Sequence, residues 1–117
     1  MNQQYNLEER VSLFSESLIG FLKTIEISVV TKSIIDQLVR SGTSIGANYY
    51  EANGAASKKD FKNKIHICKK EAKETLYWLR LLGSTIKEES IKIKCRLIWK
   101  EAHELTLIFS SIAANTK

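Results

Sequence analysis

Proline is absent from this 117-residue sequence, and glycine occurs only five times. A β-sandwich or barrel of this length needs many tight turns, which are built largely from these two residues. No apolar run approaches the roughly 20 residues that a membrane-spanning helix needs. The first ten residues lack the basic and apolar regions of a secretory signal peptide. These absences exclude most β folds and predict a single all-α domain that spans residues 1–117.

Cysteine is also scarce. Cys68 and Cys95 each lie within an apolar helical pattern rather than in a loop. They could form one disulfide bridge, but buried free thiols in a reducing compartment are the favoured interpretation. We therefore predict a cytoplasmic protein.

Apolar residues recur at the four-three spacing of a helix face in four segments, residues 7–25, 34–52, 61–83 and 91–112. The connections between these segments are short, and short connections force consecutive helices to run in opposite directions. The sequence therefore predicts an antiparallel up-down-up-down four-helix bundle.

Residues at the ends of these segments predict where the helices begin and end. Asn6 and Ser57 are expected to cap the first and third helices, because a short polar side chain accepts hydrogen bonds from the first turn. The β-branched run at residues 27–31 is expected to end the first helix. Asn53 and Gly54 are expected to end the second helix.

Gly42 and Gly46 lie inside the second segment, where each costs a helix about 1 kcal/mol. Small residues at such positions permit the close approach of another helix, and the alternative is a break in the chain. Because the apolar period continues from Ile34 to Ala52, we predict one continuous helix.

The formal net charge of +5 is concentrated in residues 58–83, which carry eight Lys and Arg side chains against three acidic ones. The simplest interpretation is a solvated helix face, and the alternative is a surface that contacts the phosphates of RNA or DNA. No RNA-recognition signature, zinc finger or glycine-rich loop accompanies the charge, so sequence-specific recognition has no support. The candidate nucleic-acid-binding residues are Lys58, Lys59, Lys62, His66, Lys69, Lys70, Lys73 and Arg80.

Apolar and aromatic side chains also lie off the four main stripes, in greater number than a monomeric bundle of this size would bury. Aromatic residues are enriched in the cores of protein interfaces. We therefore predict self-association, with candidate interface residues Tyr49, Tyr50, Trp78 and Trp99.

Catalytic and metal-binding patterns are missing. Neither His66 nor His103 follows a glutamate by three residues, as the histidines of a di-iron bundle do. There is no Gly-x-Ser-x-Gly turn. Ion pairs with nearby lysines are expected instead for four glutamates, Glu71, Glu74, Glu101 and Glu104. We predict that the protein is not an enzyme and has no catalytic residue, metal site or cofactor.

Residues 37–51, QLVRSGTSIGANYYE, carry a specific motif. The chain resembles the four-helix-bundle proteins encoded in intervening sequences of bacterial large-subunit ribosomal RNA. Their pattern is approximately Gln-Leu-x-Arg-Ser/Ala-x-x-Ser-Ile-x-Ala-Asn-x-x-Glu, and every fixed position matches. The start of the third helix at residues 59–61 and the total length also agree, so the similarity covers nearly the whole chain.

This resemblance implies an antiparallel four-helix bundle that assembles into a ring, in particular a homopentamer. Related accessory proteins of diversity-generating retroelements have a basic surface and bind nucleic acid together with a reverse transcriptase. The chain departs from the family pattern at Gly46, where proline is frequent, and at residues 70–75, which lie on the surface of the third helix. The identity of a partner therefore cannot be carried over.

The polar side chains of the motif are interpreted as structural, and the alternative is a binding site. Among small residues at a close helix contact, hydrogen-bonding side chains fix the register of two helices. Arg40 is expected to pair with Asp36, four residues earlier. The motif residues assigned this role are Gln37, Arg40, Ser41, Ser44, Asn48 and Glu51.

Together these features predict a non-enzymatic homo-oligomer, pentameric by the resemblance, that binds RNA or DNA through a basic surface. It would serve as an accessory factor linked to an rRNA intervening sequence or a retroelement, with a protein partner and without a membrane. The alternative is a protein–protein scaffold that binds no nucleic acid and whose positive charge only aids solubility.

Overall fold

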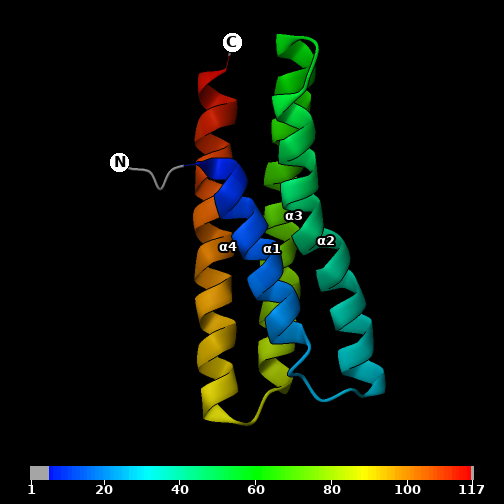
Figure 1. The fold of residues 1–117 in the computed structure, drawn as a ribbon. Coiled ribbons are helices and arrows are strands. Elements are labelled where there is room, and N and C mark those ends of the chain that lie inside the picture. The colour runs from blue at the N-terminus through cyan, green and yellow to red at the C-terminus, as the bar shows by residue number, and fades with distance from the viewer. Residues whose placement is uncertain (1–5, 117) are drawn as a thin grey trace.

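The computed structural model describes residues 6–116, and four α-helices make up most of this part of the chain. They are α1 (Leu7–Leu22), α2 (Val29–Asn53), α3 (Lys58–Thr85) and α4 (Glu89–Asn115). Figure 1 shows that each helix runs in the direction opposite to the one before it. The predicted antiparallel four-helix bundle is confirmed.

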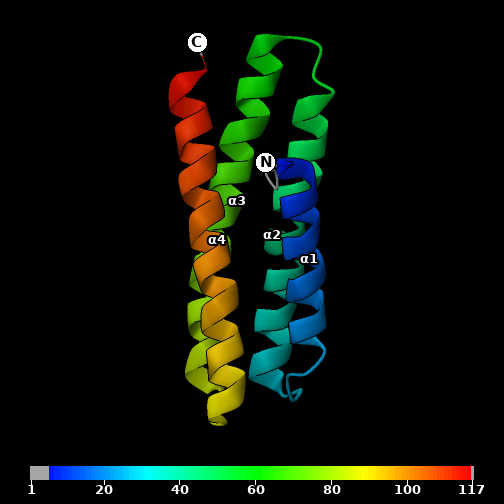
Figure 2. The ribbon, with the colours of Figure 1, turned by 60° about the vertical axis from the view of Figure 1, so that its left-hand side comes forward.

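Each helix of the bundle packs against two others. α1 contacts α2 and α4, and α3 contacts the same two helices. Figure 2 shows α1 beside α2 and α3 beside α4. α1 is the shortest helix. The turn that joins α2 to α3 therefore extends past the N-terminal end of α1 (Figure 1). Because α3 has neighbours on two sides only, one long face of it points outward.

Short polar side chains begin α1 and α3 at the predicted positions. Oδ1 of Asn6 accepts a hydrogen bond from the backbone N–H of Glu9 at 3.2 Å. Oγ of Ser57 accepts one from the backbone N–H of Asp60 at 3.0 Å. Each bond satisfies an N–H group that the first turn of a helix leaves without a partner. Both predicted caps are confirmed.

The prediction that residues 27–31 end the first helix is wrong. α1 ends at Leu22, and Val29 is already the first residue of α2. Ser28 and Thr31 form a capping box, in which each side-chain oxygen accepts a hydrogen bond from the other residue's backbone N–H, at 3.1 and 2.8 Å. This reciprocal cap outweighs the weak helix propensity of the β-branched residues and starts a new helix.

α2 is continuous across its glycines and ends at Asn53, as predicted. A Cβ atom at Gly42 would overlap Cδ2 of Leu18, and one at Gly46 would lie 3.5 Å from Cγ2 of Val11. Gly42 therefore makes room for a side chain of α1, whereas a Cβ at Gly46 would make an ordinary van der Waals contact. The contact at Gly42 compensates for its low helix propensity.

The core contains both cysteines as free thiols, so the prediction that they are buried and unpaired with each other is confirmed. Sγ of Cys68 donates a hydrogen bond to the carbonyl of Ile45 at 3.5 Å, and Sγ of Cys95 donates one to the carbonyl of Leu79 at 3.6 Å. Burial raises the pKa of the Cys68 thiol to about 12 and also raises the pKa of Cys95. Both thiols stay protonated at neutral pH and act as small core side chains.

We expect the substitutions Gly20→Ala and Gly42→Ala to differ in their effect on stability. An added Cβ at Gly20 meets nothing within 4 Å, so alanine should stabilise α1 by about 0.5–1 kcal/mol through helix propensity. At Gly42 the same methyl group must displace the fully buried Leu18, which costs about 1–3 kcal/mol. Urea denaturation measures the difference, and equal effects would show that α1 does not press on Gly42.

Candidate nucleic-acid interface

The candidate nucleic-acid-binding residues of α3 lie on its outward face. They recur at three- and four-residue spacing, while Ile65, Cys68, Ala72 and Leu79 of the same helix point into the core. Two of the eight are partly buried, Lys62 and Lys69, and the others are exposed: Lys58, Lys59, His66, Lys70, Lys73 and Arg80.

None of these eight side chains takes part in an ion pair within residues 6–116. Lys64 lies on the side of α3 that faces α2, and it does form an ion pair. Its Nζ lies 2.5 Å from Oε1 of Glu51. The charges of the six lysines and Arg80 among the eight residues are therefore not neutralised by carboxylates of the described residues, and the outward face of α3 is cationic.

The four glutamates expected to pair with lysines pair with arginines of neighbouring helices instead, so that prediction is wrong. Arg10 of α1 makes a two-bond contact with Glu101 at 2.7 and 2.9 Å and lies 3.7 Å from Glu104, both on α4. Arg40 of α2 lies 3.3 Å from Glu71 and also pairs with Glu74, both on α3. The planar guanidinium group can contact two carboxylates at once, which an ammonium group on a flexible chain does less well.

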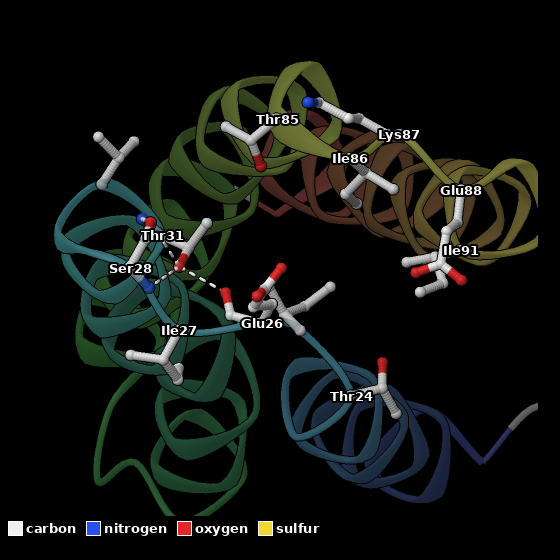
Figure 3. Close-up of a pocket in the computed structure, with 12 residues that line it drawn as sticks. Thr24, Glu26, Ile27, Ser28, Thr31, Thr85, Ile86, Lys87, Glu88 and Ile91 are labelled. Atoms are coloured by element: carbon white, nitrogen blue, oxygen red, sulfur yellow. Dashed lines mark hydrogen bonds between the residues drawn. The ribbon is translucent and has the colours of Figure 1, made fainter.

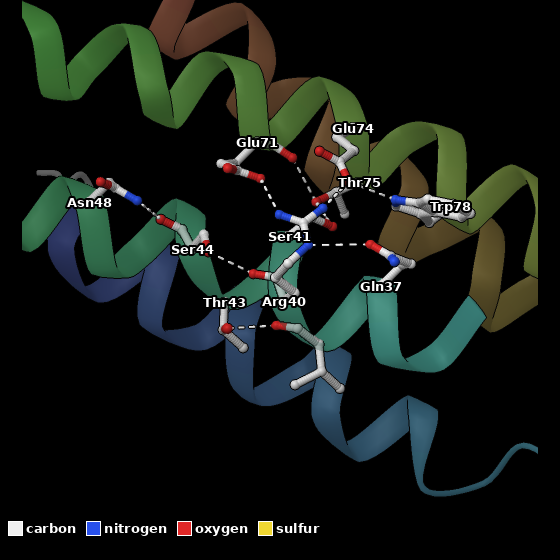
Figure 4. A network of polar contacts seen from close by, with 11 residues as sticks. Gln37, Arg40, Ser41, Thr43, Ser44, Asn48, Glu71, Glu74, Thr75 and Trp78 are labelled. Atoms are coloured by element: carbon white, nitrogen blue, oxygen red, sulfur yellow. Dashed lines mark hydrogen bonds and ion pairs between the residues drawn. The ribbon is translucent and has the colours of Figure 1, made fainter. Parts of the chain in front are cut away.

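The motif residues gather at the contact between α2 and α3 (Figure 4). The hydroxyl groups of Ser41 and Thr75 are fully buried and lie 3.0 Å apart. Beside them, Arg40 reaches Glu71, which is only 8% exposed. The predicted pair between Arg40 and Asp36 is wrong: Asp36 pairs with Lys32 at 3.3 Å, because the carboxylates of α3 attract the guanidinium group.

The remaining motif side chains form hydrogen bonds along α2. Gln37 Oε1 accepts from Nε of Arg40 at 3.2 Å. Oγ of Ser44 donates to the Arg40 carbonyl at 2.6 Å, and Nδ2 of Asn48 donates to the Ser44 carbonyl at 2.8 Å. The pair between Glu51 and Lys64 on α3 adds a third contact across the α2–α3 seam, beside those of Arg40 and Ser41.

The four candidate interface aromatics fall into two groups. Tyr49 and Trp78 are partly buried within the bundle: the Tyr49 ring lies 5.7 Å from that of Phe109, and Nε1 of Trp78 donates to Glu74 at 2.9 Å. Tyr50 and Trp99 are exposed, at 51% and 36% of their surface. Only these two present substantial surface to another molecule.

A cleft of about 420 Å³ between α3 and α4 extends the basic surface. Arg80 of α3 and Lys92 and Arg96 of α4 line it together with Trp99. The two α4 cations were not among the predicted site residues, because only the antiparallel packing of α3 on α4 brings residues 80 and 92–96 together. No local pattern could have identified them.

A second cavity, of about 450 Å³, lies at the end of the bundle where the α1–α2 and α3–α4 connections meet (Figure 3). The hydroxyl group of Thr31 is already engaged there, since it donates to the Glu26 carbonyl at 2.7 Å. Glu26, Lys87 and Glu88 also line this cavity. Two acidic side chains against one basic one make it a poor site for a polyanion.

Metal ligands do not gather in the described residues, 6–116, where no group of three or more His, Cys, Asp or Glu side chains could hold an ion. Over the same residues, no helix is both long enough and apolar enough to span a bilayer.

These observations define a class of protein, a small antiparallel helical bundle with a cationic face on α3 and a motif-bearing seam between α2 and α3. The family model of the 23S rRNA-intervening sequence proteins matches residues 10–92. The chain belongs to this family, so the resemblance inferred from residues 37–51 is confirmed.

A solved structure agrees with this assignment. The chain is similar to a protein of unknown function from the S23 ribosomal protein family of Bacteroides thetaiotaomicron VPI-5482, with 36% sequence identity and a TM-score of 0.75. The similarity covers 91% of this chain and 96% of that protein. Comparison with curated proteins finds no significant match.

We expect Arg40→Ala to lower the free energy of unfolding by about 1–2 kcal/mol, because it leaves the mostly buried Glu71 carboxylate without its cation. Lys32→Ala is the matched control. It removes an exposed pair from the same helix and should cost no more than about 0.5 kcal/mol. Urea denaturation measures the free energy of unfolding of both variants. Equal losses would mean that the Arg40 contacts do not stabilise the α2–α3 seam.

Proposed function

We propose that this protein is a non-enzymatic, homo-oligomeric module that binds nucleic acid through the outward face of α3. The observation that carries the proposal is the separation of charge in the bundle. The glutamates of α3 and α4 that could neutralise this face, at positions 71, 74, 101 and 104, are held by arginines of α1 and α2. Eight side chains of the α3 face remain without a carboxylate partner in residues 6–116.

Such a face suits a polyanion of regular charge spacing. Lys and Arg side chains that contact phosphates release bound counterions, so affinity depends on the number of contacts and falls with salt. Contacts to the phosphate backbone carry little sequence information. The proposed function is therefore binding of RNA or DNA with little sequence preference, in the cytoplasm, as an accessory factor linked to rRNA intervening sequences or a retroelement.

The proposed self-association has its own support on α4. Ile93, Leu97 and Leu107 are 47%, 60% and 52% exposed, and their spacing places them on one side of the helix, away from the core. Lys100 and Glu104 lie on the same side, and exposed apolar side chains grouped on such a face are typical of contacts between protein molecules. Together with the ring that the family resemblance implies, it favours an assembly of several copies, a homopentamer in particular.

A protein–protein scaffold is the second candidate function, and the same exposed apolar residues favour it. In that case the α3 cations are only a solvated face. The two candidates differ in one measurable property, the affinity for nucleic acid at physiological salt.

We expect the combined substitutions Lys62→Glu, Lys69→Glu and Lys73→Glu to reduce affinity for RNA or DNA by at least tenfold, because they reverse three charges on the proposed surface. In the wild type, the logarithm of affinity for duplex DNA should fall linearly with the logarithm of salt concentration, by about 0.9 for each contacted phosphate. Fluorescence anisotropy with a labelled 20-base-pair duplex and a structured RNA hairpin measures both quantities.

The control for this experiment is the combination Lys23→Glu, Lys87→Glu and Lys94→Glu. It changes the formal net charge by the same amount, but all three lysines are exposed away from the outward face of α3. Equal losses in the two triple variants would mean that net charge alone drives binding. Absence of wild-type binding at physiological salt would refute the proposed function and favour the scaffold.

We expect sedimentation equilibrium to give the wild type a mass several times the 13.3 kDa of one chain, and five times that mass for a ring of five. Leu97→Glu combined with Leu107→Glu should dissociate the assembly by placing charges on the apolar face of α4. Val29→Glu is the control, because Val29 is 91% exposed at the end of the bundle. A wild type that sediments as a single 13.3 kDa chain contradicts the prediction.

A further inference from the structure

The cleft between α3 and α4 combines an apolar floor with a cationic rim. Leu79 and Cys95 are almost fully buried beneath it, while Arg80, Lys92 and Arg96 surround it. Its volume of about 420 Å³ lies within the range of small-molecule binding sites. The cavity at the end of the bundle has no such charge distribution, because acidic side chains line it.

Trp99 supplies an aromatic ring to the lining of this cleft. Its ring is 36% exposed and stacks on the ring of His103, with 5.2 Å between ring centres and 9° between ring planes. His103 lies one turn further along α4, so the helix itself supports the stack. A ring that is held in this way loses little conformational entropy when a second flat molecule packs against it.

The cations of the cleft differ in whether they form an ion pair with a carboxylate. Nη2 of Arg96 lies 3.1 Å from Oε2 of Glu89 in an exposed pair. Arg80 and Lys92 take part in no ion pair within the described part of the chain. Arg80 also lies two turns beyond Lys73 on α3, so the cleft continues the cationic face already described.

Gly83 keeps the cleft open. It lines the cleft on the α3 side, and a Cβ atom there would meet Sγ of Cys95 at 3.6 Å, an ordinary van der Waals contact. A larger side chain at this position would occupy the cleft without changing its charge. The position therefore offers a way to block the site that is independent of Trp99.

We propose that this cleft binds an unpaired nucleotide, with its base against Trp99 and its phosphates near Arg80 and Lys92. This inference rests on the proposed function and makes it more specific. Base faces are accessible to an aromatic side chain only where the strand is unpaired, whereas phosphates are accessible in a duplex as well. The protein therefore binds single-stranded segments more tightly than duplexes of the same charge, and Trp99 is the residue that distinguishes them.

The central test compares Trp99→Leu with Trp78→Phe. Labelled 12-nucleotide oligo(dT) and oligo(U) serve as single strands, and a labelled 20-base-pair duplex serves as the paired probe, all measured by fluorescence anisotropy. Loss of a stacking contact should weaken binding of one or both single strands by about five- to a hundredfold and change duplex affinity by less than about twofold. Trp78 is partly buried outside the cleft and donates to Glu74, so Trp78→Phe should leave every affinity unchanged. The two single strands show whether DNA, RNA or both occupy the site.

Two further measurements do not depend on how well Trp99→Leu folds. In the Trp78→Phe variant Trp99 is the only tryptophan, and its emission should be quenched by oligo(dT) or oligo(U) but not by the duplex. Gly83→Leu should weaken single-strand binding as Trp99→Leu does, with helicity checked by circular dichroism and assembly by sedimentation.

The possible outcomes separate this inference from the proposed function. Binding of duplex and single strands with equal affinity, unchanged Trp99 emission, or an equal loss for all probes in Trp99→Leu would each overturn the nucleotide site while leaving the phosphate-binding face of α3 in place. If the wild type binds none of the probes, both proposals fail. Selective loss of single-strand binding in Trp99→Leu and Gly83→Leu, with the Lys62, Lys69 and Lys73 substitutions affecting every probe, supports both.

Discussion

The seam between α2 and α3 is the contact on which the other features of the bundle depend. Apolar stripes alone would let two helices slide by one turn with little loss of buried surface. The hydrogen bond between the buried hydroxyls of Ser41 and Thr75 is made in one register only, as is the contact of Arg40 with Glu71. An unpaired buried hydroxyl or carboxylate costs more than the bond itself contributes. The motif is thus explained by the energetic cost of the wrong register.

This seam also determines the electrostatics of the outer surface. Arg40 holds two glutamates of α3, and Arg10 holds two of α4, in the same arrangement on the opposite side of the bundle. Carboxylates that are engaged between helices contribute little field at the outward face of α3. The formal charge of +5 therefore acts where the lysines are exposed. The positive charge of the outward face of α3 is thus a consequence of the ion pairs that Arg10 and Arg40 form elsewhere in the bundle.

Membership of the 23S rRNA-intervening sequence protein family describes the fold and the motif, and it leaves the function to be argued from surfaces. Three surfaces of different chemistry lie side by side on α3 and α4: a cationic face, an aromatic cleft and an apolar face. A nucleic-acid-binding oligomer uses all three, whereas a scaffold uses only the last. The motif residues of the α2–α3 seam, by contrast, make their hydrogen bonds and ion pairs within the bundle.

The sequence by itself determined the features that depend on near neighbours along the chain. Apolar spacing predicted four helices, Asn6 and Ser57 were recognisable as caps, and the excess of charge in residues 58–83 was countable. Local pattern failed at residues 27–31, because Ser28 caps a helix that the β-branched residues alone argue against.

Only the tertiary structure decided which distant residues meet. The partners of Arg40 and the meeting of Arg80 with Lys92 depend on the register of one helix against another. That register is set by the packing of many side chains at once, and it leaves no mark in the spacing of residues along a single helix. Helix propensity acts over a few residues and therefore can be recognised in a single sequence. Contacts between helices cannot be recognised in this way, because their energy depends on two surfaces that come from distant parts of the sequence.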